Sequence, residues 1–352
     1  MATRAAALAA QGLRAVVLRP SPGGCVVHDA DGDPTPNLRF AMPAELPSLA
    51  KLLRADRVRH LELHHLLGHV HGIVGLARLL DVPMEAHIHD YAAFCPRVTL
   101  VSTNRRYCGE PDVGECEACI ADLGSLLEDP VSVPDLLARS AQDFAASYRV
   151  VAPSRDAAAR IRRHFPMART DVTPWEHEVW PPLTTQPPGA ARRVCVVGAI
   201  GVEKGYDVLL ACVRDARARR LPLEFMLVGY TLDDARLMDA GLIGITGEYK
   251  DADAVALIRA QAAHVGFIPS VWPETWCFAL SRVWEAGLSV AAFDLGAQAE
   301  RIRDTGRGWV LPLGLQPQAV NNALLALPLA RPHAARQSLP KLKLQHQRVS
   351  HA

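Results

Sequence analysis

Short apolar runs alternate with helical patterns along the second half of the chain. The runs are continuous, rich in β-branched residues and bounded by glycine or proline, as is typical of buried strands. In the segment 206–220, apolar residues recur at helical spacing and basic residues gather at the end. Strands that alternate with helices predict βαβ units and a parallel, doubly wound α/β domain. We expect strands at 193–198, 223–229, 242–246, 265–269, 288–293 and 308–313, and helices at 206–220, 254–263, 278–286 and 297–304.

The first half of the chain has a similar but less regular pattern. Ser132, followed by Pro134 just inside an apolar-periodic segment, is a helix-start signal. A second Rossmann-like, doubly wound domain is therefore expected. Its strands are predicted at 13–18, 25–28, 58–63, 85–89 and 149–152, and its helices at 5–13, 45–55, 73–80, 134–147 and 155–165.

A proline-rich segment separates the two halves. Residues 178–190 contain four prolines in 13 residues, a composition typical of a semi-rigid linker. The pattern predicts an N-terminal domain over 1–180, a linker over 181–190 and a C-terminal domain over 191–330. Two domains also suit a length of 352 residues. The remaining segment, 331–352, carries two lysines and three arginines without an acid, so it is a basic tail.

Composition narrows the class of protein. Lys and Arg total 38 against 37 for Asp and Glu, a balance that argues against a nucleic-acid partner. Hydrophobic residues make up 49%, which is too apolar for a disordered chain. No apolar run approaches the ~18 residues that a bilayer crossing needs. The first residues do not form a good signal peptide, because Gln11 and Arg14 interrupt them early. We expect a cytoplasmic protein.

Three segments that follow successive strands of the second domain carry a resemblance. They read VGAIGVEKG (197–205), PSVWPETW (269–276) and DLGAQAER (294–301). Ligands of doubly wound domains bind at the carboxyl ends of the strands. In this order the segments resemble the donor-binding domain of GT-B glycosyltransferases of the family 4 type, whose two Rossmann-like domains face a cleft. HIHDY (87–91) resembles the matching part of the acceptor domain.

The resemblance implies transfer of a sugar from a UDP- or GDP-sugar to a glycan or lipid-linked glycan. It further implies retention at the sugar carbon, no metal or other cofactor in catalysis, and a place in polysaccharide biosynthesis. Lys204 would neutralise the leaving diphosphate, and the N-terminus of the helix that begins near Gly296 would face it. The glycines of the first segment would let the backbone approach the donor; they are Gly198, Gly201 and Gly205.

The same resemblance assigns the remaining candidates. Glu274 would contact hydroxyls of the donor sugar, and His89 would reach the sugar from the acceptor domain; both are the predicted catalytic residues. Glu300 is a further donor-side candidate. At position 282 the family usually has a ribose-binding glutamate, whereas this chain has Arg282. Glu285 lies one helical turn further on, where it would partly substitute.

Four cysteines gather within 25 residues of the first domain, in an insert over 91–125. The final C-x2-C pair is a common half-site for structural zinc. The alternative is four reduced thiols in an ordinary loop. The cysteines of this predicted zinc site are Cys95, Cys108, Cys116 and Cys119.

Two other functions stay open at this point. Arg282, Ala199 in place of a phosphate-binding arginine, and the apparent lack of the first strand and Gly-rich loop of the family would suit an inactive glycosyltransferase-like protein. That protein would bind a nucleotide sugar or a partner. A nucleotide-sugar epimerase shares the two-domain architecture. The basic tail would allow a weak peripheral contact with anionic lipid.

Overall fold

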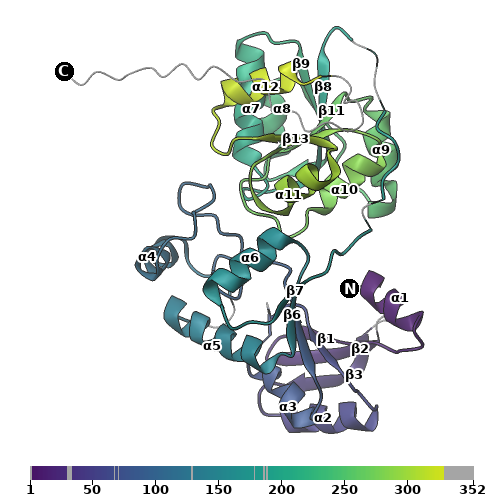
Figure 1. Cartoon of the computed structure of the whole chain (residues 1–352), viewed down its shortest axis with the longest axis vertical. Coiled ribbons are helices and arrows are strands. Elements are labelled where there is room, and N and C mark those ends of the chain that lie inside the picture. Colours follow the sequence, from purple (N-terminus) through teal and green to yellow (C-terminus); the bar gives the residue numbers. More distant parts are fainter. Residues whose placement is uncertain are drawn as a thin grey trace, which may run out of the picture.

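The computed structural model forms two lobes, which correspond to the two predicted domains (Figure 1). The structure describes residues 2–29, 34–66, 68–69, 71–127, 130–177, 179–184, 187 and 189–328. The predicted basic tail 331–352 and part of the predicted linker lie outside these ranges. No helix in them combines the length and the apolar character that a membrane crossing requires.

The C-terminal lobe contains one parallel sheet of six strands. Their spatial order is β10-β9-β8-β11-β12-β13, and every neighbouring pair is parallel. All six strands were predicted. Their bounds are β8 Arg192–Ile200, β9 Leu223–Thr231, β10 Ile243–Ile245, β11 Val265–Ile268, β12 Val290–Phe293 and β13 Gly308–Leu311.

Helices cover both faces of this sheet, as a doubly wound domain requires. One buried cluster joins the sheet to α7 and α12, and a second joins it to α10. Four of the helices lie where helical spacing predicts them: α7 (Tyr206–Ala218), α9 (Ala254–Ala260), α10 (Phe278–Glu285) and α11 (Gly296–Thr305). Two helices were not predicted, α8 (Asp234–Ala240) and α12 (Pro317–Ala326).

The N-terminal lobe contains a parallel sheet of four strands in the order β4-β5-β6-β7. Their bounds are β4 Leu61–Leu63, β5 Met84–His87, β6 Arg149–Ala152 and β7 Thr170–Val172, the last of which was not predicted. The helices are α2 (Leu46–Ala55), α3 (Leu76–Leu80) after the 3-10 turn η1 (His71–Gly75), α5 (Val133–Ala146) and α6 (Arg155–His164). Ser132 caps α5 by accepting a hydrogen bond from the N–H of Asp135, as predicted.

One part of the first-domain prediction is wrong. The strands expected at 13–18 and 25–28 were assigned to the doubly wound sheet, but they form a separate antiparallel meander. Its strands are β1 (Val16–Ser21), β2 (Gly24–Asp29) and β3 (Pro34–Ala41). Only Pro22 and Gly23 join β1 to β2, and a parallel connection needs a dozen or more residues. The helix expected at 5–13 ends earlier, as α1 (Ala2–Ala9).

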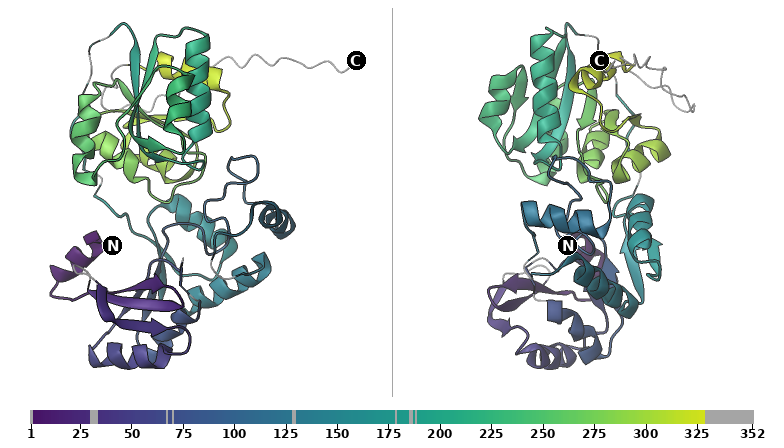
Figure 2. Two further views of the ribbon diagram at one scale, coloured as in Figure 1. Left: turned by 180° about the vertical axis from the view of Figure 1, so that it is seen from behind. Right: turned by 90° about the vertical axis from the view of Figure 1, so that its left-hand side faces the viewer.

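The two lobes meet along α6, α11 and the segment before α10. Helix α6 lies against α11 of the other lobe, and both views of Figure 2 place the lobes end to end in this way. The cysteine-bearing insert leaves the N-terminal lobe beside this junction and contains α4 (Val113–Leu123). Residues 89–91, which follow β5, contact residues 273–275 of the segment before α10, and we call this contact between the lobes the seam. The turn after β8 packs on the same segment, so the carboxyl ends of β5 and β8 both lie near the seam.

Candidate functional site

The first two of the three segments that carry the resemblance, 197–205 and 269–276, pack directly on each other. Gly205 has a φ of 87°, and a Cβ at this position would lie 2.0 Å from the carbonyl oxygen of Pro269. The N–H of Val271 donates to the carbonyl oxygen of Glu203 over 2.9 Å. Glycine is therefore required where the chain turns from β8 into α7, because any side chain would push the segment 269–276 away.

The third segment closes on the second in the same way. Gly296 begins α11 with a φ of 66°, and a Cβ there would lie 2.6 Å from Cα of Pro273. The N–H of Ala297 donates to the carbonyl oxygen of Glu274 over 2.9 Å. This N–H at the start of α11 is thus already bound within the protein. All three segments that carry the resemblance meet at one place.

Lys204 and Glu274 lie on two of these segments, close enough for their charges to interact. Glu274 is buried, with 7% of its surface exposed, and accepts a hydrogen bond from the hydroxyl of Ser270. Burial lowers the pKa of Lys204, but the negative charges of Glu274 and Glu203 outweigh it, so the net pKa is raised. The ammonium of Lys204 is therefore held in its charged form in a half-buried position. The role of Lys204 beside a diphosphate stays a prediction.

The other glycines of the first segment allow the backbone of β8 to approach its neighbours. Gly198 has a φ of 117°, and a Cβ on the adjacent Gly229 would lie 2.1 Å from the carbonyl oxygen of Gly198. A Cβ on Gly201 would lie 2.6 Å from the carboxylate of Glu203. Gly201 and Gly229 therefore have no room for a side chain.

His89 comes to the same seam from the N-terminal lobe. The hydroxyl of Thr275 donates to the carbonyl oxygen of His89 over 2.8 Å, and the hydroxyl of Tyr91 donates to that of Pro273 over 2.7 Å. His89 lies two residues beyond the end of β5 rather than within the strand. Burial, reinforced by the neighbouring His64, lowers the pKa of His89 to about 3, so its imidazole is neutral. Both predicted catalytic residues, His89 and Glu274, thus lie at the seam.

A cavity of about 100 Å³ opens beside His89 at the carboxyl ends of β4 and β5. Its wall on the far side is α5, which contributes Leu136, Ser140 and Phe144. The strand ends contribute polar side chains, among them His64, His65, His87 and Asp90. A small polar molecule bound here would lie next to the seam.

Histidines and carboxylates near this cavity form two sets with the composition of a metal site. Within each set, among the described residues, the ligand atoms lie within 4.8 Å of one another; the sets are Glu62, His64, His87 and His60, Glu62, Glu85. Both carboxylates already face guanidinium groups, however: Arg4 binds Glu62 and Arg149 binds Glu85. Each arginine supplies the positive charge that a cation would bring, so these sets do not fit a metal as they lie.

The zinc site predicted from the four cysteines of the insert stays a prediction. A tetrahedral site with Zn–S bonds of ~2.3 Å needs the sulfur atoms close together. The described groups of three or more ligand atoms within 4.8 Å of one another contain none of these cysteines. Burial raises the pKa of the Cys95 thiol to about 12 and that of Cys116 to about 11, which favours neutral thiols. Cys95, Cys108, Cys116 and Cys119 remain free thiols here.

Arg282 and Glu285 form an ion pair, with 2.9 Å between the guanidinium and the carboxylate. Arg282 also binds Asp251 over 2.9 Å. The carboxylate of Glu285, which was expected to substitute for the family's glutamate at position 282, is therefore bound by Arg282 itself. A different carboxylate reaches this helix: Glu176, from the segment after β7, accepts hydrogen bonds from the indole N–H of Trp276 and the hydroxyl of Ser281. The sequence pattern did not indicate Glu176, because it lies 100 residues before Trp276 in the chain.

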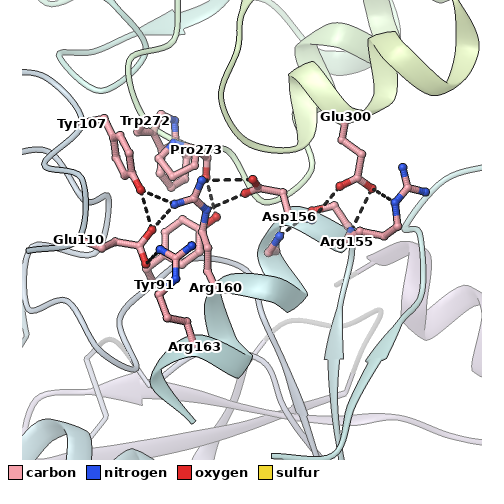
Figure 3. A network of polar contacts seen from close by, with 12 residues as sticks. Tyr91, Tyr107, Glu110, Arg155, Asp156, Arg160, Arg163, Trp272, Pro273 and Glu300 are labelled. Carbon is pink, nitrogen blue, oxygen red and sulfur yellow. Dashed lines mark hydrogen bonds and ion pairs between the residues drawn. The ribbon is translucent and has the colours of Figure 1, made fainter. Parts of the chain in front are cut away.

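Glu300 lies at the junction of the lobes. Its carboxylate accepts hydrogen bonds from the N–H groups of Arg155 and Asp156, over 3.0 and 2.7 Å, at the start of α6 (Figure 3). A carboxylate at a helix N-terminus is a stabilising arrangement. The structure thus gives this predicted donor-side residue partners in the other lobe.

A buried network beside Glu300 anchors the insert to α6 (Figure 3). Arg160 bridges the carboxylates of Asp156 and Glu110, and Tyr107 donates to Glu110 over 2.7 Å. The side chain of Glu110 is 1% exposed. The segment that follows β5 is therefore fixed next to the seam by charge pairs.

Comparison with known proteins places this site in context. Residues 191–328 match the family described as glycosyl transferases group 1. The C-terminal lobe is a group 1 glycosyltransferase domain. Comparison with curated proteins found no match.

Solved structures extend the likeness from the glycosyltransferase domain to both lobes. Anabaena HepE, in complex with UDP-glucose, is 13% identical with a TM-score of 0.52, over 81% of this chain and 73% of that chain. Sucrose-phosphate synthase from Thermosynechococcus elongatus is 14% identical with a TM-score of 0.52, over 88% and 75%. The pneumococcal O-GlcNAc transferase GtfA, in complex with UDP and GlcNAc, is 13% identical with a TM-score of 0.52, over 88% and 61%. The fold is GT-B.

Proposed function

We propose that this protein transfers a sugar from a UDP- or GDP-sugar to a glycan or lipid-linked glycan. The observation that carries the proposal is the packing of the segments that hold Lys204 and Glu274 on each other, at a seam that also holds His89. The HepE and GtfA structures, which share the fold, contain UDP-glucose, or UDP with GlcNAc. Reactions of this kind need a positive group beside the diphosphate and polar groups beside the sugar.

Each residue has a defined part in this proposal. The ammonium of Lys204 opposes the charge that grows on the diphosphate as it leaves. The carboxylate of Glu274 accepts hydrogen bonds from sugar hydroxyls, and the neutral imidazole of His89 contacts the sugar from the other lobe. The acceptor oxygen bonds to the sugar carbon on the face from which the diphosphate leaves, so the sugar keeps its configuration, and the departing phosphate oxygen takes the acceptor's proton. Lys204 supplies the charge that a divalent ion would otherwise bring, so catalysis needs no metal.

Nucleotide binding tests the proposal directly. We expect UDP or GDP to bind to the purified chain, as measured by isothermal titration calorimetry. K204A should weaken binding about 10- to 100-fold, because it removes a charge-assisted contact of about 1.5–3 kcal/mol. K250A is the matched control, since Lys250 is an exposed lysine of the same domain, and it should bind like the wild type. Equal affinity of wild type and K204A would contradict the proposal.

The ion pair of Arg282 with Glu285 favours one second candidate, an inactive protein that binds a nucleotide sugar. Both groups that could hold the ribose are engaged with each other. Release of UDP or GDP from a panel of nucleotide sugars separates the two functions. Turnover supports the transferase; binding without turnover supports the inactive protein; isomerisation of the donor would indicate an epimerase. An action in polysaccharide biosynthesis at the cytoplasmic face of a membrane would fit a lipid-linked acceptor.

A further inference from the structure

A chain of hydrogen bonds leads from a buried carboxylate to His89. Glu62 lies within β4, His64 directly follows this strand, and His89 follows the neighbouring strand β5. The carboxylate of Glu62 lies 3.0 Å from Nε2 of His64, and Nδ1 of His64 lies 2.9 Å from Nε2 of His89. Each of these three side chains thus touches the next through one ring nitrogen or oxygen.

The carboxylate decides where the protons lie. Burial raises the pKa of Glu62, but hydrogen bonds from His64 and Arg4 outweigh this effect, so the net pKa is lowered and the group is ionised. An ionised carboxylate only accepts hydrogen bonds, so Nε2 of His64 carries a proton. Nδ1 of His64 and Nε2 of His89 share the next hydrogen bond, and with a single proton on each ring its donor is Nε2 of His89. The remaining nitrogen of His89, Nδ1, is left as an acceptor.

Packing holds the rings in this orientation. The rings of His64 and His87 stack, with centroids 4.4 Å apart, and His89 stacks on Trp175 at the same distance. Arg4 donates twice to Glu62 over 3.1 Å. Other titratable groups also lie near these three side chains. His60 lies within 4.8 Å of the carboxylate of Glu62, Glu85 lies 2.7 Å from His87, and His65 pairs with Asp90 over 3.0 Å. Neither Glu85 nor Asp90 makes a hydrogen bond to His89 among the described contacts.

We propose that Glu62 and His64 are positioning residues that hold His89 with its proton on Nε2, so that Nδ1 accepts a hydrogen bond from a sugar hydroxyl. The contact with a sugar rests on the proposed function, whereas the proton arrangement rests on the two hydrogen bonds and on the ionised carboxylate of Glu62. In this arrangement His89 selects a sugar whose hydroxyl donates a hydrogen bond to Nδ1. A deoxy or O-methyl sugar has no such hydroxyl at that position and would lose the contact.

Nuclear magnetic resonance of the full chain, with ¹⁵N-labelled histidine, tests the proton arrangement. A slowly exchanging ring N–H of His89, assigned to Nε2, is expected in the wild type. H64F keeps a ring but removes both nitrogens, so this signal should disappear. H64N places an amide oxygen near the former Nδ1 and should restore it. H65F is the matched control, because His65 stacks on His89 without a hydrogen bond, and it should leave the signal unchanged.

Two results would overturn the proposal: the His89 signal persists in H64F, or the shared proton is bound to Nδ1 of His64 in the wild type. Thermal unfolding of each variant shows that it is folded. Kinetics then test the sugar contact. H64F should lower kcat about 10-fold with a donor KM within about twofold of the wild type, and H64N should recover part of kcat. A wild type with the predicted N–H but no sugar transfer would refute the proposed function and leave the proton arrangement intact.

Discussion

At the scale of single residues, the contact between segments 197–205 and 269–276 depends on a position where a side chain cannot be accommodated. Gly205 combines a positive φ with a main-chain contact, while Lys204 beside it supplies charge. Both were predicted from the sequence, since a glycine-rich turn after a buried strand is a local signal. Lys204 and Glu274 needed the resemblance as well, because nothing local distinguishes them from other loop lysines and helix-start acids.

Gly205→Ala should destabilise the protein by about 3 kcal/mol or more, because Cβ would overlap the carbonyl oxygen of Pro269. Urea unfolding at pH 7 measures the loss. Gly306→Ala is the control: its φ is 65°, but a Cβ there would meet nothing within 4 Å. That variant should lose only about 1 kcal/mol. Similar losses in both variants would show that the contact with Pro269 is not tight.

Other residues of the site were beyond the reach of sequence patterns. His64 and His89 are 25 residues apart, and Tyr91 and Pro273 are 182 apart. Periodicity and motif spacing report local structure, so contacts of this kind appear only once the strands are arranged. The density of histidines over 60–71 was visible, but it did not reveal which ring faces His89.

At the scale of elements, the regular βαβ half was predictable and the other half was partly so. The strands of the C-terminal sheet are continuous and β-branched, and each is separated from the next by a helix. The meander β1–β3 has similar apolar runs, but the length of its connection decides its direction. The four thiols illustrate a different limit: their spacing suggests zinc, whereas their positions depend on how the insert folds. Metal analysis of the purified chain decides whether zinc is bound.

The N-terminus of α6 depends on a carboxylate from the other lobe. Glu300→Ala should reduce stability by about 1–2 kcal/mol, because two N–H groups of the first turn lose their acceptor. Thermal or urea unfolding measures the change. Asp304→Ala removes only a largely exposed partner of Arg155 and should cost less than about 1 kcal/mol. If the two variants lose equal stability, the helix start does not depend on Glu300.

The network around Glu110 should make stability depend on acid. Burial raises the pKa of Glu110, but hydrogen bonds from His164 and Tyr107 and the charge of Arg160 lower it to about 2 in net. A carboxyl group whose pKa is lower in the folded than in the unfolded protein stabilises the folded state. This stabilisation is complete at pH values above the unfolded-state pKa of about 4.3 and is lost as the pH falls towards 2.

Glu110→Gln should therefore lose about 3 kcal/mol at pH 7, and the difference from the wild type should shrink between pH 4 and about 2. Urea unfolding across this range measures it. Glu115→Gln, on the exposed side of α4, serves as the control and should follow the wild type. A loss for Glu110→Gln that does not change with pH would contradict the assignment to charge.

At the scale of the whole molecule, two hydroxyls join the lobes at the seam. Tyr91→Phe should lower the stability of the junction by about 1–2 kcal/mol, since the carbonyl of Pro273 loses its donor. Differential scanning calorimetry should show two unfolding transitions, one for each lobe, whose midpoint temperatures differ more than in the wild type. Tyr206→Phe is matched in chemistry, because Tyr206 donates to the carbonyl of Asp233 within one lobe. That control should lower stability without separating the lobes.

The bonds of Tyr91 and Thr275 run in opposite directions, and each ends on a carbonyl oxygen of the backbone. Every residue offers such an oxygen, so these two bonds do not themselves depend on the side chains of the residues that accept them. Chimeras that combine one lobe of this protein with the opposite lobe of a relative would need to preserve these two hydroxyl groups, together with the carboxylate of Glu300 that caps α6, to keep the junction.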